Sequence, residues 1–447
     1  MVHARQGWVF FIFSLFLSGF LASCQQPVDE TQMQTRVAQA VETLYAGLSP
    51  TPSLRVTSTS TSIPATSLAE MSPTLPPPPD PTETFAPSAS QTLLPPTATT
   101  WLVTETAIPT VQLANGLVSL GVPGNYQTLG SHARITDLQV WQAKIYIAHG
   151  DWIQNSGPVR ALAYDPATGA FVWDENYLFD EEQVEILRLV DGNLLIPGGD
   201  GRESWEFGNL YLHQPGAAWR KLRSLAGGVH IWDVAASGSH WVAVGSGEAG
   251  DGRIWRSVDD GGNWMLDSVG DSLLGVDAEN PLNTHAGLFR LNGQLYLSAA
   301  SGCYLDDGSS WQPALGCDLI GRTIHKSVEW GGVAVLLPYF TRPVDAASLL
   351  LVYDGATTEL IDFGLPVLDV TTLEGQLLVL TSPGAGKAQI FSSAAPGQGF
   401  TLLVELALPP LYPLKPSAAW PLAMEAWDGS LYLGLQDGQL LRYDLND

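Results

Sequence analysis

A repeat of about 46 residues runs through the C-terminal part of this 447-residue chain. Four tryptophans, at positions 173, 219, 264 and 311, each follow a turn sequence that contains glycine. Two weaker copies, at Asp354-Gly355 and Pro396-Gly397, keep the same period without the tryptophan. A period of this size predicts an architecture in which one small structural unit recurs along the chain.

A short apolar segment precedes each turn, and several of these segments follow Asp-Gly, Asn-Gly or Gly-Gly, which are hairpin signals. Each repeat therefore contains two hairpins, or four strands, the content of one propeller blade. We predict an all-β fold, a β-propeller of seven four-stranded blades over residues 115–447, with six or eight blades as the alternatives. The seven segments are Lys144–Ile147, Asn193–Ile196, His240–Ala243, Gln294–Leu297, Val333–Leu336, Gln376–Val379 and Ser430–Leu433.

The last repeat is one strand short. It starts near Trp420, and the sequence stops after the apolar segment Leu440–Tyr443, where an outermost strand should follow. The strand-like segment Leu117–Leu120 precedes the first complete repeat. We predict that this N-terminal strand completes the last blade, because such closure removes exposed sheet edges.

The N-terminus has the order of a secretory signal: Arg5 is followed by the apolar run Trp8–Phe20 and then by Leu21-Ala22-Ser23-Cys24. The last four residues resemble the lipobox of bacterial lipoproteins. That resemblance implies a signal peptide over residues 1–23 and diacylation of Cys24, which would anchor the protein stably. We expect an exported protein, lipid-anchored at the bacterial cell surface or membrane. An uncleaved signal anchor is the alternative.

Two segments separate this anchor from the repeats. Within residues 24–48, apolar residues from Met33 to Leu48 recur at three- or four-residue steps, which predicts a short amphipathic helix. It could self-associate, lie on the membrane or have no partner. Residues 49–114 are rich in Pro, Ser and Thr, a composition that cannot form a core and predicts a disordered linker.

The charge of the chain excludes one class of partner. Its formal net charge is −25 at pH 7, and it lacks the Lys/Arg clusters that bind phosphate backbones. We therefore expect no nucleic-acid binding. We also expect no cofactor and a monomeric body.

The third repeat contains Ser257-Val258-Asp259-Asp260-Gly261-Gly262-Asn263-Trp264. This string resembles the Asp-box of sialidase-like propellers, with Asn263 in place of the usual threonine. A degraded copy follows in the fourth repeat. The resemblance implies a structural hairpin role, and it names a fold without naming a reaction. The residues that match are Ser257, Asp259, Gly261, Trp264, Asp306, Gly308 and Trp311.

Two cysteines besides Cys24, Cys303 and Cys317, flank the hairpin of the fourth repeat. In an exported protein this placement predicts a disulfide, with two unpaired buried thiols as the alternative. Neither cysteine has a second cysteine or a histidine at close ligand spacing, so we expect no metal site there.

The innermost strands of a propeller line its central channel, so polar residues near their starts are candidate ligands. Carboxylates lie near the histidines that recur there, and together they could bind a cation or a polar ligand. The alternative is that each histidine forms ordinary hydrogen bonds within its own blade. We assign no metal. The candidate residues are His132, His230, His285 and His325, with Asp137, Glu185, Asp233 and Asp369 nearby.

Other candidates lie in loops. Trp152 and Trp205 could stack on sugar rings or pack against other residues. The acidic cluster Asp180–Glu182 with Glu185 could hold calcium, but we expect a solvated loop.

These features favour a non-catalytic binding module that presents its loops to a protein or carbohydrate partner. The alternative is an exported glycosidase, since sialidases share the Asp-box and the propeller. That resemblance implies an arginine cluster with Phe/Tyr-Arg-Ile-Pro early in the domain, but the nearest string here is Phe289-Arg290-Leu291 in the fourth repeat. A third class is an assembly factor that docks on a membrane complex. We expect no enzymatic activity.

Overall fold

The computed structural model describes residues 102–104, 111–113, 116–123, 134–152, 157–199, 201–267, 273–274, 285–319, 323–409 and 419–445. The chain divides into two units, residues 1–92 and 93–447, and all described residues belong to the second. Cys24, the predicted signal peptide and the predicted amphipathic helix lie outside them. Within the described ranges, no helix is long and apolar enough to cross a membrane.

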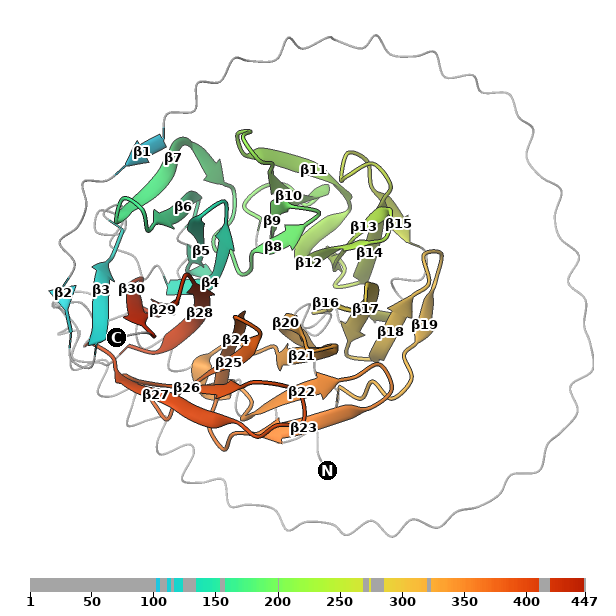
Figure 1. The fold of residues 1–447 in the computed structure, drawn as a ribbon. Coiled ribbons are helices and arrows are strands. Elements are labelled where there is room, and N and C mark those ends of the chain that lie inside the picture. The colour runs from blue at the N-terminus through green and yellow to red at the C-terminus, as the bar shows by residue number, and fades with distance from the viewer. Residues whose placement is uncertain are drawn as a thin grey trace, which may run out of the picture. The chain divides into compact units, whose positions relative to one another are not determined.

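Seven antiparallel sheets form a ring, as predicted (Figure 1). Blade 1 contains β4 (Arg134–Trp141), β5 (Lys144–Gly150), β6 (Val159–Asp165) and β7 (Ala170–Phe179). Blade 2 contains β8 (Arg188–Val190), β9 (Asn193–Pro197), β10 (Phe207–His213) and β11 (Arg220–Ala226). Blade 3 contains β12 (Gly228–Ser237), β13 (His240–Gly247), β14 (Gly252–Ser257) and β15 (Met265–Asp267). Blade 4 contains β16 (Gly287–Leu291), β17 (Gln294–Ala299), β18 (Gly302–Asp306) and β19 (Trp311–Pro313).

The remaining blades follow the same plan. Blade 5 contains β20 (Ile324–Trp330), β21 (Val333–Pro338), β22 (Leu349–Tyr353) and β23 (Thr358–Asp362), with the 3-10 helix η4 (Pro343–Asp345) before β22. Blade 6 contains β24 (Val367–Leu373), β25 (Gln376–Thr381), β26 (Lys387–Ser393) and β27 (Thr401–Ala407). Blade 7 contains β28 (Pro421–Trp427), β29 (Ser430–Leu435) and β30 (Leu440–Asp444). The seven predicted apolar segments all lie in the second strands of their blades.

A strand from the N-terminal side of the propeller completes blade 7, as the sequence predicts. Strand β3 (Leu117–Gly121) pairs antiparallel with β30, from Leu117 opposite Tyr443 to Gly121 opposite Leu440. In Figure 1 the blue-green β3 lies beside the red β30. Strand β3 is therefore the outer strand that the last repeat lacks.

Two short strands extend the outer edges of blades 1 and 7. Strand β1 (Leu102–Thr104) pairs with β7, and β2 (Val111–Gln112) pairs with β3, so these two sheets have five strands. Both strands lie inside the range assigned to the linker from its composition. The C-terminal part of that range is thus hydrogen-bonded to the propeller.

The core lies between the blades. Seven clusters of buried apolar side chains occur, and each takes its members from two neighbouring sheets. Trp219 and Trp311, two tryptophans of the repeat, are 7% exposed and fill the outer parts of two clusters. The tryptophans recur with the repeat because each of these two rings fills the outer end of an interface between neighbouring blades.

The turn between β14 and β15 is held by its own side chains. Ser257 Oγ donates to Asp259 Oδ1 (2.8 Å) and accepts from the Gly261 N–H (3.0 Å). Asp259 accepts from the Asn263 N–H (2.7 Å), and the Trp264 indole donates to the Gly261 carbonyl (3.1 Å). The side chains of Ser257, Asp259 and Trp264 thus form hydrogen bonds within the turn itself.

Cys303 and Cys317 form the predicted disulfide, with a Cα–Cα distance of 5.8 Å. Cys303 lies in β18, and Cys317 follows β19. The bond closes a loop over a sequence separation of 14 residues, so in the loop-entropy model it stabilises the fold by about 3 kcal/mol.

We predict that replacing both cysteines with serine lowers the free energy of unfolding by about 3 kcal/mol. Urea denaturation of the variant and of the wild type, with and without reductant, measures this loss. Cys24→Ser is the matched control, because it removes a thiol without touching the disulfide. An unchanged urea midpoint on reduction of the wild type would contradict the prediction.

Candidate functional site

Three aspartates lock neighbouring blades together along the central channel. Asp137, Asp233 and Asp369 are buried in the innermost strands β4, β12 and β24, and each lies just after a register shift. One carboxylate oxygen accepts from the next residue's N–H and the other from an N–H of the following blade. The donors are Leu138 and Leu187 for Asp137, Val234 and Leu288 for Asp233, and Val370 and Met424 for Asp369.

Two cations pair with these three carboxylates. Arg188 binds Asp233 with both Nε (2.7 Å) and a terminal nitrogen (3.2 Å). Lys326 Nζ lies 3.0 Å from Asp137 Oδ1 and 2.9 Å from Asp369 Oδ1. Buried charges need such partners. The aspartates identified near the channel therefore stabilise the propeller. Their carboxylate oxygens already accept backbone hydrogen bonds and form ion pairs.

This charged layer divides the channel into two cavities. In β12, residues from His230 to Asp233 line a cavity of about 270 Å³, whereas residues from Val234 to Ala236 line one of about 350 Å³. In β20 the division falls between His325 and Lys326. We call the cavity on the His230 side the channel-mouth pocket.

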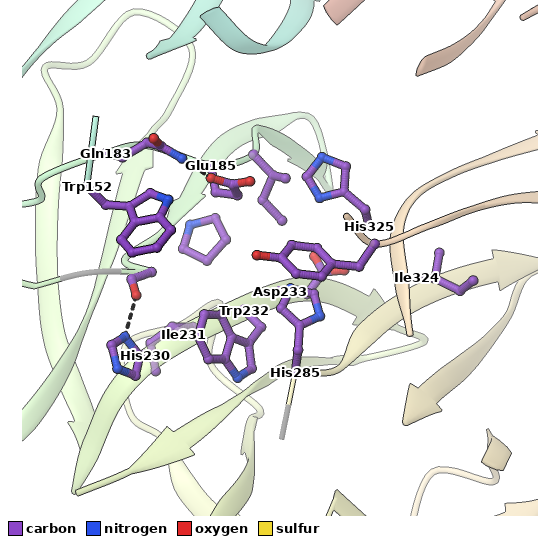
Figure 2. A pocket seen from close by; sticks show the side chains of 14 residues that line it. Trp152, Gln183, Glu185, His230, Ile231, Trp232, Asp233, His285, Ile324 and His325 are labelled. Carbon is purple, nitrogen blue, oxygen red and sulfur yellow. Dashed lines mark hydrogen bonds between the residues drawn. The ribbon is translucent and has the colours of Figure 1, made fainter. Parts of the chain in front are cut away.

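The channel-mouth pocket is walled by aromatic and imidazole rings from blades 1, 3, 4 and 5 (Figure 2). Three ring contacts form a continuous series: His230 on Trp232 (5.0 Å, 11°), Trp232 on His285 (5.0 Å, 34°) and His285 on Tyr339 (4.0 Å, 24°). Rings so arranged present faces that attract the C–H groups of a ligand. The six rings are Trp152, His230, Trp232, His285, His325 and Tyr339.

The histidines of the pocket are neutral at pH 7. Burial, together with the nearby His325 and Arg188, lowers the pKa of His285 to about 3. Burial also lowers the pKa of His325 to about 4 and that of His230 below its usual value. The three imidazoles therefore act as flat hydrogen-bonding rings and carry no charge.

Two ring nitrogens of the pocket wall have no hydrogen-bond partner among the described residues: Trp232 Nε1 and His285 Nδ1, both buried. His230 differs, because its Nδ1 lies 2.6 Å from the Gly199 carbonyl oxygen. Buried polar atoms without a partner are rare in folded proteins. Both nitrogens are enclosed by protein, so they do not face the open space of the pocket.

One end of the pocket is polar. Glu185 accepts a hydrogen bond from the Gln183 amide, and Arg134 Nε donates to Gln183 Oε1 (2.9 Å). Burial raises the pKa of Glu185, and the charge of Arg134 partly offsets this. Figure 2 shows Glu185 and Gln183 on the same side of the cavity as Trp152, away from His285.

The structure brings together six of the residues that the sequence singled out: Trp152, Glu185, His230, Asp233, His285 and His325. His132 lies outside the described residues. Trp205 is 52% exposed in the β9–β10 loop and does not line the pocket. Across the described ranges, no group of three or more His, Cys, Asp or Glu side chains has the arrangement of a metal site.

The expectation of a solvated acidic loop at residues 180–182 and 185 is wrong. Glu181 is fully buried, and its Oε1 accepts from Asn209 (2.7 Å) and from the Tyr211 hydroxyl (2.9 Å). Glu185 lines the channel-mouth pocket. Glu181 and Glu185 therefore face protein, whereas the Asp180 side chain is 42% exposed and pairs with Lys221.

Sequence reasoning missed Trp232 and Tyr339. Trp232 lies two residues after His230 in β12, and the two-residue period of a strand puts both side chains on one face. The sequence therefore contained a signal for Trp232. Tyr339 directly follows β21 and meets His285 from the neighbouring blade. No local pattern marks that contact.

We predict that His285→Phe makes stability less sensitive to acid. In the wild type the unfolded chain takes up a proton near pH 6.5, but the folded chain does so only near pH 3, so stability is lost as the pH falls between these values. Removing the titrating group should reduce this loss by about 1.4 kcal/mol per pH unit. Urea denaturation of both proteins between pH 7 and about pH 4 measures it. Parallel pH profiles would contradict the prediction.

No family model matches the chain. No curated protein matches it either. Solved structures are similar at low identity: virginiamycin B lyase from Staphylococcus aureus is 9% identical with a TM-score of 0.48, covering 73% of this chain and 98% of that one. The computationally designed Ika8 protein is 13% identical with a TM-score of 0.44, covering 73% of this chain and 99% of that one. A chain of the mitotic checkpoint complex is 12% identical with a TM-score of 0.45, covering 80% and 99%. These similarities are too distant to assign a function.

Proposed function

We propose that this protein is an exported, lipid-anchored binding protein whose propeller holds its ligand in the channel-mouth pocket without chemical turnover. The observation that carries the proposal is the pocket wall itself. Six rings from four blades line a space of about 270 Å³, and Glu185 and Gln183 form its polar end. Apolar walls with a few convergent polar atoms are typical of small-ligand sites.

The N-terminal part of the proposal rests on sequence alone. Arg5, the apolar run Trp8–Phe20 and the lipobox-like Leu21–Cys24 favour export and lipidation at Cys24. Metabolic labelling with a fatty acid tests this: the wild type should incorporate label, and Cys24→Ala should not. Label retained by Cys24→Ala would exclude this residue as the lipid site.

We also assign the β14–β15 turn to the Asp-box type. The bonds of Ser257 to Asp259 and Gly261 support this assignment, because they use the Ser and Asp positions of the motif to close the hairpin. The turn follows the third strand of blade 3, and its residues do not line the channel-mouth pocket. Its role in the proposal is structural.

The chemistry of the acids favours binding over glycoside hydrolysis. Hydrolysis of this kind uses two carboxyl groups that face the substrate. Two acids line the pocket, Glu185 and Asp233, but the oxygens of Asp233 are bound by Arg188 and by the Val234 and Leu288 N–H groups. Only Glu185 is placed to act on a ligand, and one carboxyl group does not complete the pair.

A binding screen with a turnover assay tests the proposal. The full-length chain in detergent is incubated with panels of oligosaccharides and short peptides; binding is followed by calorimetry and products by mass spectrometry. We expect saturable binding without products, weakened in Trp232→Leu and unchanged in Trp205→Ala, which alters an exposed tryptophan outside the pocket. Product formation would favour the glycosidase alternative. Binding that is insensitive to Trp232→Leu would exclude the channel-mouth pocket as the site.

A further inference from the structure

The two acids of the channel-mouth pocket differ in how their charge is balanced. Arg188 binds Asp233 through two nitrogens, at 2.7 and 3.2 Å. Glu185 accepts a hydrogen bond from the Gln183 amide, and no described Lys, Arg or His lies within salt-bridge distance of its carboxylate. The pocket is therefore lined by a half-buried carboxylate that has no ion-pair partner in the described part of the chain.

Arg134 compensates the charge of Glu185 only in part. Its Nε donates to Gln183 Oε1 (2.9 Å), so the Gln183 amide group bridges the guanidinium and the carboxylate. Burial raises the pKa of Glu185, and the charge of Arg134 offsets only a part of this rise. The ionised carboxylate is thus less stable in the pocket than in water. A cation bound beside it would supply the missing compensation.

The other titratable groups of the wall do not oppose a bound cation. Burial lowers the pKa values of the three histidines, His230, His285 and His325, so these rings are neutral at pH 7. The positive charge of Arg188 is paired with Asp233. Among the described lining residues, Glu185 therefore determines which sign of ligand charge is favoured.

The surface near Glu185 is mostly hydrocarbon. Trp152 lies on the same side of the cavity (Figure 2), is 38% exposed and has no ring contact with a described residue, so its indole is accessible to a ligand. Tryptophan attracts cations over its ring face more strongly than other aromatic side chains. The aliphatic lining residues are Ile186, Pro197, Ile231 and Ile324.

Such a wall suits a cation that is covered by methyl groups. A bare ammonium group has three N–H donors and is strongly hydrated, so it would lose water to hydrocarbon without gaining an acceptor for each donor. A trimethylammonium group has no N–H donor. Its methyl groups can contact the rings and aliphatic side chains while its charge is attracted by the carboxylate.

We infer that the channel-mouth pocket binds the head group of a methylated ammonium ion, with its positive charge beside Glu185 and its methyl groups against Trp152. This inference rests on the proposed function and names the ligand class of the same site. The same head group occurs on free solutes and on methylated lysine side chains of peptides, and the experiment below separates these two sources.

Matched ligands test the inference. Choline is compared with the uncharged alcohol in which a carbon replaces its nitrogen, and with ethanolamine, which keeps the charge and lacks the methyl groups. A short peptide with trimethyllysine is compared with the same peptide with lysine. Each ligand is titrated into the full-length chain in detergent, and saturation-transfer NMR reports its affinity. We expect choline, the peptide or both to bind more tightly than the matched ligands by about tenfold or more.

The variant Glu185→Gln separates charge from shape, because it keeps the form of the side chain. We expect the affinity for the methylated cation to fall by about tenfold or more, since the charge of Arg134 is then unopposed, and the affinity for the uncharged alcohol to stay the same. Trp152→Ala should also weaken cation binding. Glu405→Gln, which removes an exposed acid from the outer strand β27, is the matched control and should change no affinity.

The outcomes separate this inference from the proposed function. Equal affinity for choline and the uncharged alcohol, lost for both in Trp152→Ala, would overturn the ligand class and leave the site standing. Equal affinity for choline and ethanolamine would overturn the role of the methyl groups. Cation binding that persists in both Glu185→Gln and Trp152→Ala would lie outside the pocket and overturn the inference. The absence of binding by every cation would also overturn it, whereas the proposed function would then be decided by the sugars and unmodified peptides of the screen.

Discussion

Lys326→Met is expected to lower the free energy of unfolding by about 3–5 kcal/mol. The Lys326 ammonium group lies within 3.0 Å of carboxylate oxygens of Asp137 and Asp369, and it joins blades 1, 5 and 6 across the channel. Burial alone would lower the pKa of Lys326, but these two carboxylates hold it above its usual value. Methionine fills a similar volume and leaves both carboxylates without their cation.

The loss should also depend on pH. Burial raises the pKa of Asp369 to about 7, because it outweighs the stabilisation that Lys326 gives to the carboxylate. Without Lys326 the folded protein must protonate this site, which is easy at pH 5 and costly at pH 8. The destabilisation should therefore grow as the pH rises. Urea denaturation at both pH values measures it, with Lys387→Met, at an exposed lysine, as the control that should change stability by less than about 0.5 kcal/mol. Equal losses in the two variants would contradict the account.

A chain that begins at residue 122 is expected to lose cooperative folding, whereas one that begins at residue 93 should keep it. The shorter chain lacks β3, which leaves the edge of β30 unpaired. It also lacks the buried side chains of Leu117, Val118 and Leu120. Burying each of them contributes about 1.5–3 kcal/mol, so their sum approaches the whole stability of a typical domain.

Thermal unfolding of the two truncated chains, followed by circular dichroism and by light scattering, measures the effect. The chain from residue 93 begins at the boundary between the two units, so it is the matched control. We expect the chain from residue 122 to aggregate through its exposed strand edge and to show no sharp transition. Equal melting temperatures would show that β3 is not needed to close the ring.

The fold was predictable because its determinants are local and repeated. Turn sequences and apolar strands mark each blade, a tryptophan follows the turn in four of the repeats, and the missing last strand follows from counting strands. The disulfide was predictable because Cys303 and Cys317 flank one hairpin. These features need only the order of residues within about one repeat.

The site was predictable only in part, since its contacts join distant parts of the chain. Lys326 and Asp137 are 189 positions apart, and Arg188 and Asp233 are 45 apart. One signal was available for the aspartates: each lies two residues after Ile or Val and just before Leu or Val, as in Ile135-Thr136-Asp137-Leu138. Which cation each would bind depends on where the ring closes, and no spacing rule gives that.

The histidines illustrate the same limit. Their position near the starts of inner strands placed His230, His285 and His325 at one end of the channel. Their neutrality and their stacking on Trp232 and Tyr339 depend on burial between blades. The sequence therefore indicated where the pocket lies, and the structure indicates what kind of ligand suits it.

The central claim, that ligands bind in the channel-mouth pocket, is tested most directly by comparing Trp152→Ala with Trp205→Ala in calorimetric titrations of the best ligand from the screen. Both tryptophans are exposed loop residues, but only Trp152 lines the pocket. The account predicts about tenfold weaker binding for Trp152→Ala, or about 1.4 kcal/mol, and an unchanged dissociation constant for Trp205→Ala. Weaker binding in Trp205→Ala with unchanged binding in Trp152→Ala would contradict it and move the site to the β9–β10 loop.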